Sequence, residues 1–129
     1  MMFLRYHLPV ILYAGLIFIS SSISTIPQQL PEFSFRDKLI HIVEFFIFGC
    51  LLWRSVFQWS LAKNVSKVLI LSMLLGAFYA ATDEIHQRFV PGRDGNFYDW
   101  LADIIGLAIA VVTSYIFSKE RGLLDNMND

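Results

Sequence analysis

The chain has 129 residues, of which 56% are hydrophobic and 16% aromatic, and its mean hydropathy is +0.55. These values exceed what a soluble globular domain of this length carries, so the sequence predicts an integral membrane protein. The net charge of −1 provides no basic surface for a nucleic acid. The lone cysteine, Cys50, has no partner for an internal disulfide and lies within an apolar stretch.

Four hydrophobic segments follow one another along the chain, and we expect each to cross the membrane as a helix. The first covers about residues 8–26 and ends at Pro27, and the second covers about residues 38–59. The uncharged parts of the third and fourth, residues 68–82 and 104–118, have only 15 residues each. Each would reach about 22 Å, which is short of a bilayer core of about 30 Å.

The two short segments must therefore extend through acidic residues in order to span. The third would continue through Asp83 and Glu84, and the fourth would begin near Asp99 and pass through Asp103. If the four helices alternate in direction, these acids share one membrane surface with the start of the second segment. The sequence thus predicts one all-α, polytopic membrane domain over residues 1–129, with four transmembrane helices and a structured polar loop between helices three and four.

Basic residues are unequally divided between the two predicted sides of the membrane. Six lie beside the termini and the middle loop, namely Arg5, Arg54, Lys63, Lys67, Lys119 and Arg121, and four lie on the other side, namely Arg36, Lys38, Arg88 and Arg93. The positive-inside rule therefore predicts a multi-pass cell-membrane protein with both termini in the cytoplasm and the polar groups on the outer face.

Small residues recur at every fourth position in the last two segments. They are Ser72, Gly76 and Ala80 in the third, and Ala102, Gly106, Ala110 and Ser114 in the fourth. Such stripes let membrane helices approach closely, so we expect these two helices to pack together and bring Glu84 near Asp99 and Asp103. The alternative is that the small residues only permit dense packing and mark no functional site.

Charged residues also open the second segment. Asp37, His41 and Glu44 share a helix face, and Lys38 lies three residues before His41. Ionisable groups at this depth do not belong against lipid. Two interpretations stay open for His41, an internal ion-pair network and a binding or proton-handling site, whereas a structural role is favoured for Glu44.

The connection between the last two segments, residues 83–99, is dense in charge. Turn signals at residues 91–92 and 94–96 predict a tight loop. The guanidinium of Arg93 suits a bidentate contact to a carboxylate or to a lipid phosphate. We favour the internal salt bridge, to Asp83, Glu84 or Asp99, because acids in a low-dielectric site need compensation.

Other chemistries fit the sequence less well. His41 with Glu84, His86 or Asp103 would supply the ligand types of a divalent metal, but no recognised metal spacing is present, so we predict no metal and no cofactor. His86 is expected to be solvated. No serine or cysteine stands in a nucleophile motif, which disfavours a covalent catalyst. General acid or base catalysis by His41 stays open.

Three motifs lie at helix edges. They are Lys38-x-x-His41 with aromatic Phe45, Asp83-Glu84-x-x-Gln87-x-Phe89-x-Pro91-Gly92-Arg93, and Asp99-x-x-x-Asp103-x-x-Gly106. In order and spacing they resemble the VanZ-like family of small bacterial membrane proteins, over about residues 37–110. At one position the chain departs from the family pattern, which usually has asparagine where this chain has Asp103. An extra ionisable group therefore enters the site.

The resemblance implies a relative of the protein that lowers sensitivity to teicoplanin, a glycopeptide antibiotic that binds cell-wall precursors outside the cell. We expect an outward-facing polar pocket whose partners are membrane lipids, a lipid-linked cell-wall intermediate or the glycopeptide itself. The expected ligand-binding residues are Lys38, His41, Asp83, Glu84, Gln87, Arg93, Asp99 and Asp103. Two alternatives stay open: a membrane-embedded enzyme that acts on a lipid headgroup with His41 as acid or base, and a proton-coupled carrier.

Overall fold

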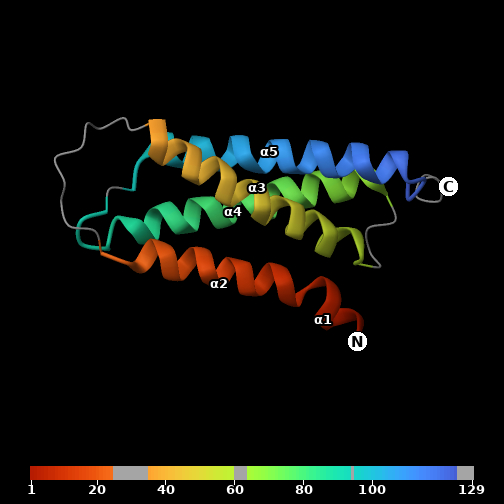
Figure 1. Cartoon of the computed structure of the whole chain (residues 1–129), viewed down its shortest axis with the longest axis horizontal. Helices are drawn as coiled ribbons and strands as arrows, with labels where there is room; N and C mark the ends of the chain where they lie inside the picture. The colour runs from red at the N-terminus through yellow and green to blue at the C-terminus, as the bar shows by residue number, and fades with distance from the viewer. Residues whose placement is uncertain (25–34, 60–63, 94, 125–129) are drawn as a thin grey trace.

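The computed structural model describes residues 1–24, 35–59, 64–93 and 95–124, and all regular structure within these ranges is helical (Figure 1). The helices are α1 (Met2–Tyr6), α2 (Leu8–Ser22), α3 (Phe35–Phe57), α4 (Val65–Gln87) and α5 (Phe97–Glu120). The prediction of an all-α fold is therefore confirmed for the described part of the chain.

Three helices, α3, α4 and α5, are long and apolar enough to cross a membrane. The predicted extension through acidic residues is confirmed, because α4 continues past Asp83 and Glu84 and α5 begins before Asp99. Helix α2 is apolar but has only 15 residues, so it is about 22 Å long. The predicted end of the first segment, at residues 26–27, lies outside the described residues.

Side chains and a glycine fix the turn between α4 and α5. Asn96 caps α5, because its side-chain oxygen accepts the backbone N–H of Tyr98 at 2.8 Å and that of Asp99 at 3.0 Å. Gly92 has a φ of 80°, a backbone conformation that glycine adopts without strain. The turn predicted at residues 91–92 is thus confirmed, whereas the second predicted turn includes Asp94, which lies outside the described residues.

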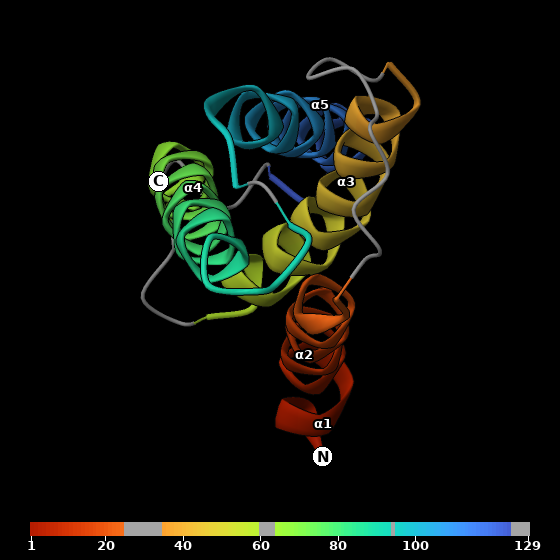
Figure 2. The same cartoon turned by 90° about the vertical axis from the view of Figure 1, so that its left-hand side faces the viewer.

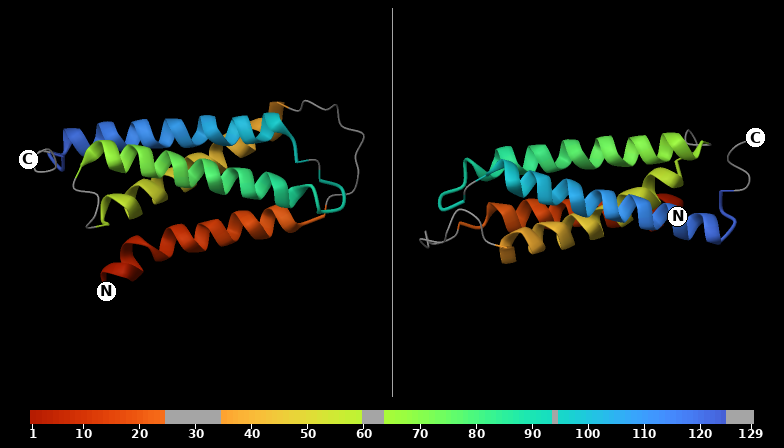
Figure 3. Two further views of the ribbon diagram at one scale, coloured as in Figure 1. Left: turned by 180° about the vertical axis from the view of Figure 1, so that it is seen from behind. Right: turned by 90° about the horizontal axis from the view of Figure 1, so that it is seen from above.

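The helices form a bundle whose two ends differ. The C-terminal ends of α2 and α4 and the N-terminal ends of α3 and α5 lie at one end, which we call the charged end (Figures 1 and 3). The opposite end, which we call the terminal end, holds α1, the end of α3, the start of α4 and the end of α5. Viewed along the bundle, α3, α4 and α5 group together and α2 lies beside α3 and α4 (Figure 2).

Glycines set the closest approaches between helices. A Cβ atom on Gly106 would overlap the backbone carbonyl oxygen of Ile42, and one on Gly49 would lie 2.6 Å from the Cβ of Ala110. The small residues of α5 therefore face α3. Helix α4 also packs on α5, as predicted, but through Leu107, which fills the space over Gly76. We expected the stripe on α5 to face α4, and it faces α3 instead, so this part of the prediction is wrong.

Candidate functional site

Lys38 joins α3 to α5 at the charged end. Its ammonium group contacts the carboxylate of Asp99 and lies 3.3 Å from an oxygen of Asp37. The side chains of Lys38 and Asp99 are 8% and 5% exposed, so this is a buried ion pair. Removing two charges from water is costly, which makes the pair a candidate for more than packing.

His41 forms the next contact along the same two helices. Its Nδ1 lies 2.9 Å from Oδ1 of Asp103, and its Nε2 lies 3.9 Å from Oδ1 of Asp99. Helices α3 and α5 both begin at the charged end and run in the same direction. Residues 38 and 41 on one helix therefore meet residues 99 and 103 on the other.

Glu84 adds α4 to this cluster. Its Oε2 accepts the backbone N–H of Asn96 at 3.0 Å, which ties α4 to the first turn of α5. One ligand-type atom each from Glu84, His41 and Asp103 lie within 4.8 Å of one another. The prediction that Glu84 comes near Asp103 is therefore confirmed. Among the described residues, Oε1 of Glu84 and Oδ2 of Asp103 are buried with no hydrogen-bond partner.

Asp83 faces the other way, toward α2. Its Oδ1 accepts the hydroxyl of Ser21 at 2.6 Å, and its Oδ2 accepts the side-chain amide of Gln87 at 2.9 Å. Both acceptor oxygens of this buried carboxylate are therefore used within the bundle. Asp83 therefore joins α4 to α2 through Ser21, and Gln87 binds the same carboxylate from the next turn of α4.

The two serines beside Ser21 make similar contacts, which the sequence reasoning missed. Ser20 donates to Oε1 of Glu44 at 3.2 Å, and the hydroxyl of Ser22 lies 2.9 Å from Nε2 of His86. His86 is also stacked on Phe18 and is half-buried, so in addition to its solvent exposure it contacts α2 through two side chains. The available signal was a run of three serines at the end of an otherwise apolar segment.

Arg93 does not form the salt bridge that the sequence favoured. Its guanidinium donates to the backbone carbonyl oxygens of Ser20 at 2.8 Å and Ile23 at 3.4 Å. The last carbonyls of a helix lack partners within the helix and carry partial negative charge, which attracts a cation. Arg93 therefore holds the α4–α5 turn against the end of α2. No ion pair within 4.0 Å joins it to a carboxylate in the described part of the chain.

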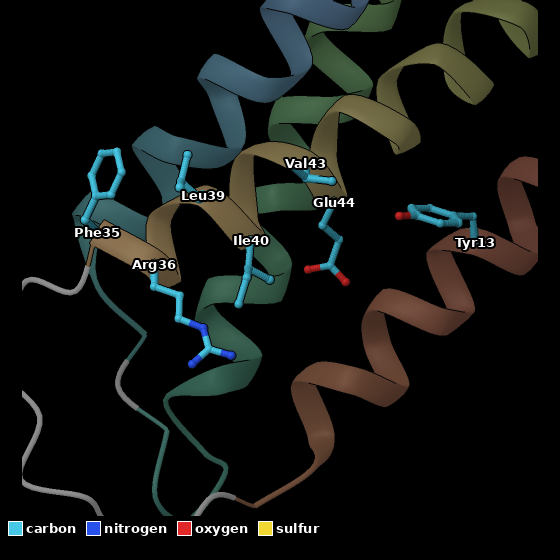
Figure 4. Close-up of a pocket in the computed structure, with 7 residues that line it drawn as sticks. All are labelled: Tyr13, Phe35, Arg36, Leu39, Ile40, Val43 and Glu44. Carbon is cyan, nitrogen blue, oxygen red and sulfur yellow. The ribbon is translucent and has the colours of Figure 1, made fainter.

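The carboxylate of Glu44 turns toward α2, where its Oε1 accepts the hydroxyl of Ser20. It points into the gap between α3 and α2, opposite Tyr13 (Figure 4). This gap is a cleft of about 520 Å³ lined by Tyr13, Phe35, Arg36, Leu39, Ile40, Val43 and Glu44. The cleft is not lined by any of the eight residues predicted to bind a ligand.

The predicted residues thus divide into three groups at the charged end. Lys38, His41, Glu84, Asp99 and Asp103 form one cluster between α3, α4 and α5. Asp83 and Gln87 form a second group toward α2, and Arg93 binds the end of α2. Because carboxylates outnumber the bases of the first cluster, its chemistry suits a cation or a hydrogen-bond donor better than an anion.

The chain matches the VanZ/LLP1 family over residues 6–118. No curated protein and no solved structure matches it. The match extends beyond the three motifs to include α2 and nearly all of α5. Since it covers most of the 129 residues, this chain belongs to the VanZ/LLP1 family.

Proposed function

We propose that this protein binds an anionic envelope lipid, or a lipid-linked cell-wall intermediate, in the cleft between α2 and α3. The observation that carries the proposal is the cleft itself, about 520 Å³ in volume, with apolar walls and a few polar groups (Figure 4). Clefts of roughly 300–1,000 Å³ with this composition are typical of small-molecule sites.

The apolar wall of the cleft suits an acyl or prenyl chain. Leu39, Ile40 and Val43 are 44%, 55% and 57% exposed and belong to a helix apolar enough to lie in a bilayer. A lipid chain that lies along them would enter from the membrane without crossing water. Burial of apolar surface from both partners would then favour the complex.

The polar groups of the cleft suit a headgroup. Arg36 lies in the first turn of α3, at the charged end, where an exposed guanidinium can bind a phosphate with two parallel hydrogen bonds. Tyr13 and Glu44 lie deeper and can bind hydroxyl or amide groups. Because Lys38 and Arg93 already bind internal partners, we assign the anion contact to Arg36.

The proposal places the charged end on the outer face, with α2 as a fourth span and both termini in the cytoplasm. The distribution of basic residues supports this orientation. It is tested by labelling intact cells with a membrane-impermeant maleimide, in a Cys50→Ala background. Phe89→Cys at the charged end should react, and Trp59→Cys at the terminal end should react only after lysis. The reverse pattern would contradict the orientation.

Lipid binding is tested by mass spectrometry of the lipids that stay with protein purified in a mild detergent. Anionic lipids should be enriched over the bulk membrane, and Arg36→Ala and Val43→Trp should each reduce the enrichment several-fold. Matched controls are Arg54→Ala, an exposed arginine on the same face of α3 at the terminal end, and Ile47→Trp, one turn beyond Val43. The proposal would be contradicted if the lipids bound to the wild type had the same composition as the bulk membrane. It would also be contradicted if all four variants lost the same amount of anionic-lipid enrichment.

An effect on teicoplanin sensitivity is the physiological consequence that the family resemblance suggests. A protein that holds a cell-wall intermediate at the outer surface would compete with the antibiotic for it. Expression of the wild type in a sensitive bacterium should raise the inhibitory concentration of teicoplanin, and Arg36→Ala should not. If the protein is expressed and the inhibitory concentration is unchanged, lipid binding by this protein does not confer resistance to teicoplanin.

One observation favours a second candidate, a headgroup-modifying enzyme. Asp103 hydrogen-bonds Nδ1 of His41 at 2.9 Å, an arrangement that orients an imidazole for acid or base catalysis. Purified protein incubated with a labelled phospholipid would then release a headgroup product, and His41→Gln would abolish that release. Turnover that persists in His41→Gln would remove this candidate.

A further inference from the structure

Two groups of metal-ligating side chains share His41. In each, one ligand-type atom per residue lies within 4.8 Å of the others: Asp37, His41 and Asp99 in the first, and His41, Glu84 and Asp103 in the second. The ligands come from three different helices in the second group, so no local sequence spacing could have indicated it.

The first group already contains a cation. The ammonium of Lys38 contacts the carboxylates of both Asp37 and Asp99 and so offsets one of their two negative charges, while the side chain of Asp37 is 47% exposed to solvent. The second group differs, because no lysine or arginine forms an ion pair with Glu84 or Asp103 within the described residues, and the contact of Asp103 is to His41, which is itself one of the three candidate ligands. If an ion binds at this end of the bundle, the second group is the place for it.

The second group is also more deeply buried. His41, Glu84 and Asp103 are 6%, 5% and 0% exposed. Oε1 of Glu84 and Oδ2 of Asp103 have no hydrogen-bond partner in the described structure, although each is a strong acceptor. A buried carboxylate oxygen left without a partner is costly, and a cation bound among the three side chains would compensate the charge of both carboxylates.

We infer that His41, Glu84 and Asp103 form a binding site for a divalent transition-metal ion, Zn²⁺ or Mn²⁺. One imidazole nitrogen with two carboxylates suits these ions, whereas Ca²⁺ and Mg²⁺ prefer oxygen ligands alone. Small side-chain adjustments bring such atoms to the usual metal–ligand distances of about 2.0–2.2 Å. Three protein ligands leave a further coordination position for water or for a bound group. The inference does not depend on the proposed lipid cleft.

The test measures metal content and thermal stability of purified full-length protein. After treatment with a chelator and its removal, the protein is titrated with Zn²⁺, Mn²⁺ and, as a negative control, Ca²⁺. Wild-type protein should retain one equivalent of Zn²⁺ or Mn²⁺ by elemental mass spectrometry, and its unfolding temperature should rise with that metal and not with Ca²⁺.

Variants then locate the ion. Glu84→Gln and Asp103→Asn keep the side-chain shape and remove one charged ligand, so each should lower metal retention at least tenfold. Asp37→Asn, in the group that contains Lys38, should retain the wild-type amount. Circular dichroism checks that the variants are folded.

Wild-type protein that retains no metal above the Glu84→Gln/Asp103→Asn double variant would overturn the inference. In that case the buried carboxyl groups are compensated by protons. Equal loss of metal from Asp37→Asn and Asp103→Asn would also overturn it, because the ion would then belong to the first group.

Discussion

The two ends of the bundle join their helices with different groups. At the charged end the contacts use ionisable side chains, above all Lys38 with Asp99 and His41 with Asp103. At the terminal end the buried contact between α3 and α5 is neutral, because Trp53 donates to Ser118 at 3.3 Å. The hydroxyl of Ser55 lies 2.7 Å from a ring nitrogen of His7, and the exposed guanidinium of Arg54 donates to the backbone carbonyl oxygen of Arg5 at 3.1 Å. The same helices are thus held together in two chemically distinct ways.

This difference shows that one end of the bundle joins α3 to α5 without buried charge. Neutral hydrogen bonds and apolar packing join α3 to α5 at the terminal end, at lower desolvation cost. At the charged end, the side chains that lose their hydration lie within one helical turn of the close backbone contact between Ile42 and Gly106. We therefore propose that the buried charges of the charged end serve function, and the variants below test this proposal.

The largest expected effect comes from breaking the Lys38–Asp99 pair. Lys38→Ala leaves Asp99 buried beside Asp103 without its ammonium partner, so the free energy of unfolding should fall by about 3–5 kcal/mol. Denaturant titration of the detergent-solubilised protein, followed by circular dichroism, measures the change.

A double variant shows whether the charges themselves stabilise the fold. Lys38→Met with Asp99→Leu makes this part of the charged end resemble the neutral terminal end, and should recover most of the stability lost in Lys38→Ala. A double variant as unstable as Lys38→Ala would mean that the pair has a structural role that neutral groups cannot replace.

A smaller effect is expected at the backbone contact behind the cluster. Gly106→Ala places a methyl group against the carbonyl oxygen of Ile42, so the unfolding free energy should fall by about 3 kcal/mol, because a backbone atom cannot rotate away. Gly15→Ala is the matched control, since a Cβ there meets nothing within 4 Å. It should stabilise α2 by up to about 1 kcal/mol. Equal effects of the two variants would mean that α3 and α5 can separate without cost.

The smallest expected losses of stability come from replacing one serine at each end of the bundle. Ser21→Ala removes a hydrogen bond to the carboxylate of Asp83 and should cost about 2 kcal/mol. Ser118→Ala removes the neutral hydrogen bond from Trp53 and should cost about 0.6 kcal/mol. Chemical denaturation of both variants in the same detergent provides the comparison. Costs that are equal, or reversed in order, would contradict the proposed contrast between the ends.

Much of this architecture could be predicted from hydropathy and charge. The uncharged runs were too short to span a bilayer, so α4 had to include Asp83 and Glu84 and α5 had to include Asp99. This inference is possible because the rise per residue of an α-helix is fixed. The prediction that Glu84 approaches Asp103 is also confirmed, although α4 and α5 meet through Leu107 and not through their two small-residue stripes.

The remaining features depend on which helices are neighbours, and the residues within a single helix do not determine this. The stripe with Gly106 indicated a close neighbour without identifying α3. Arg93 had several acidic candidates nearby in sequence, yet binds backbone carbonyls of a helix about 70 residues earlier in the chain. Carbonyl groups are present at every position, so no side-chain pattern marks them as targets.

The contact between Ile42 and Gly106 has a consequence for how the bundle responds to its surroundings. Where the backbones of α3 and α5 touch, no change of side-chain rotamer can alter the spacing between the two helices. Lateral pressure from the bilayer should therefore act on the other helix–helix contacts of the bundle. The hydrogen bonds that attach helix α2 use the side-chain hydroxyl groups of Ser20, Ser21 and Tyr79, which reorient by rotation about single bonds. A change in lipid packing should therefore displace α2 first and leave the separation of His41 from Asp103 unchanged.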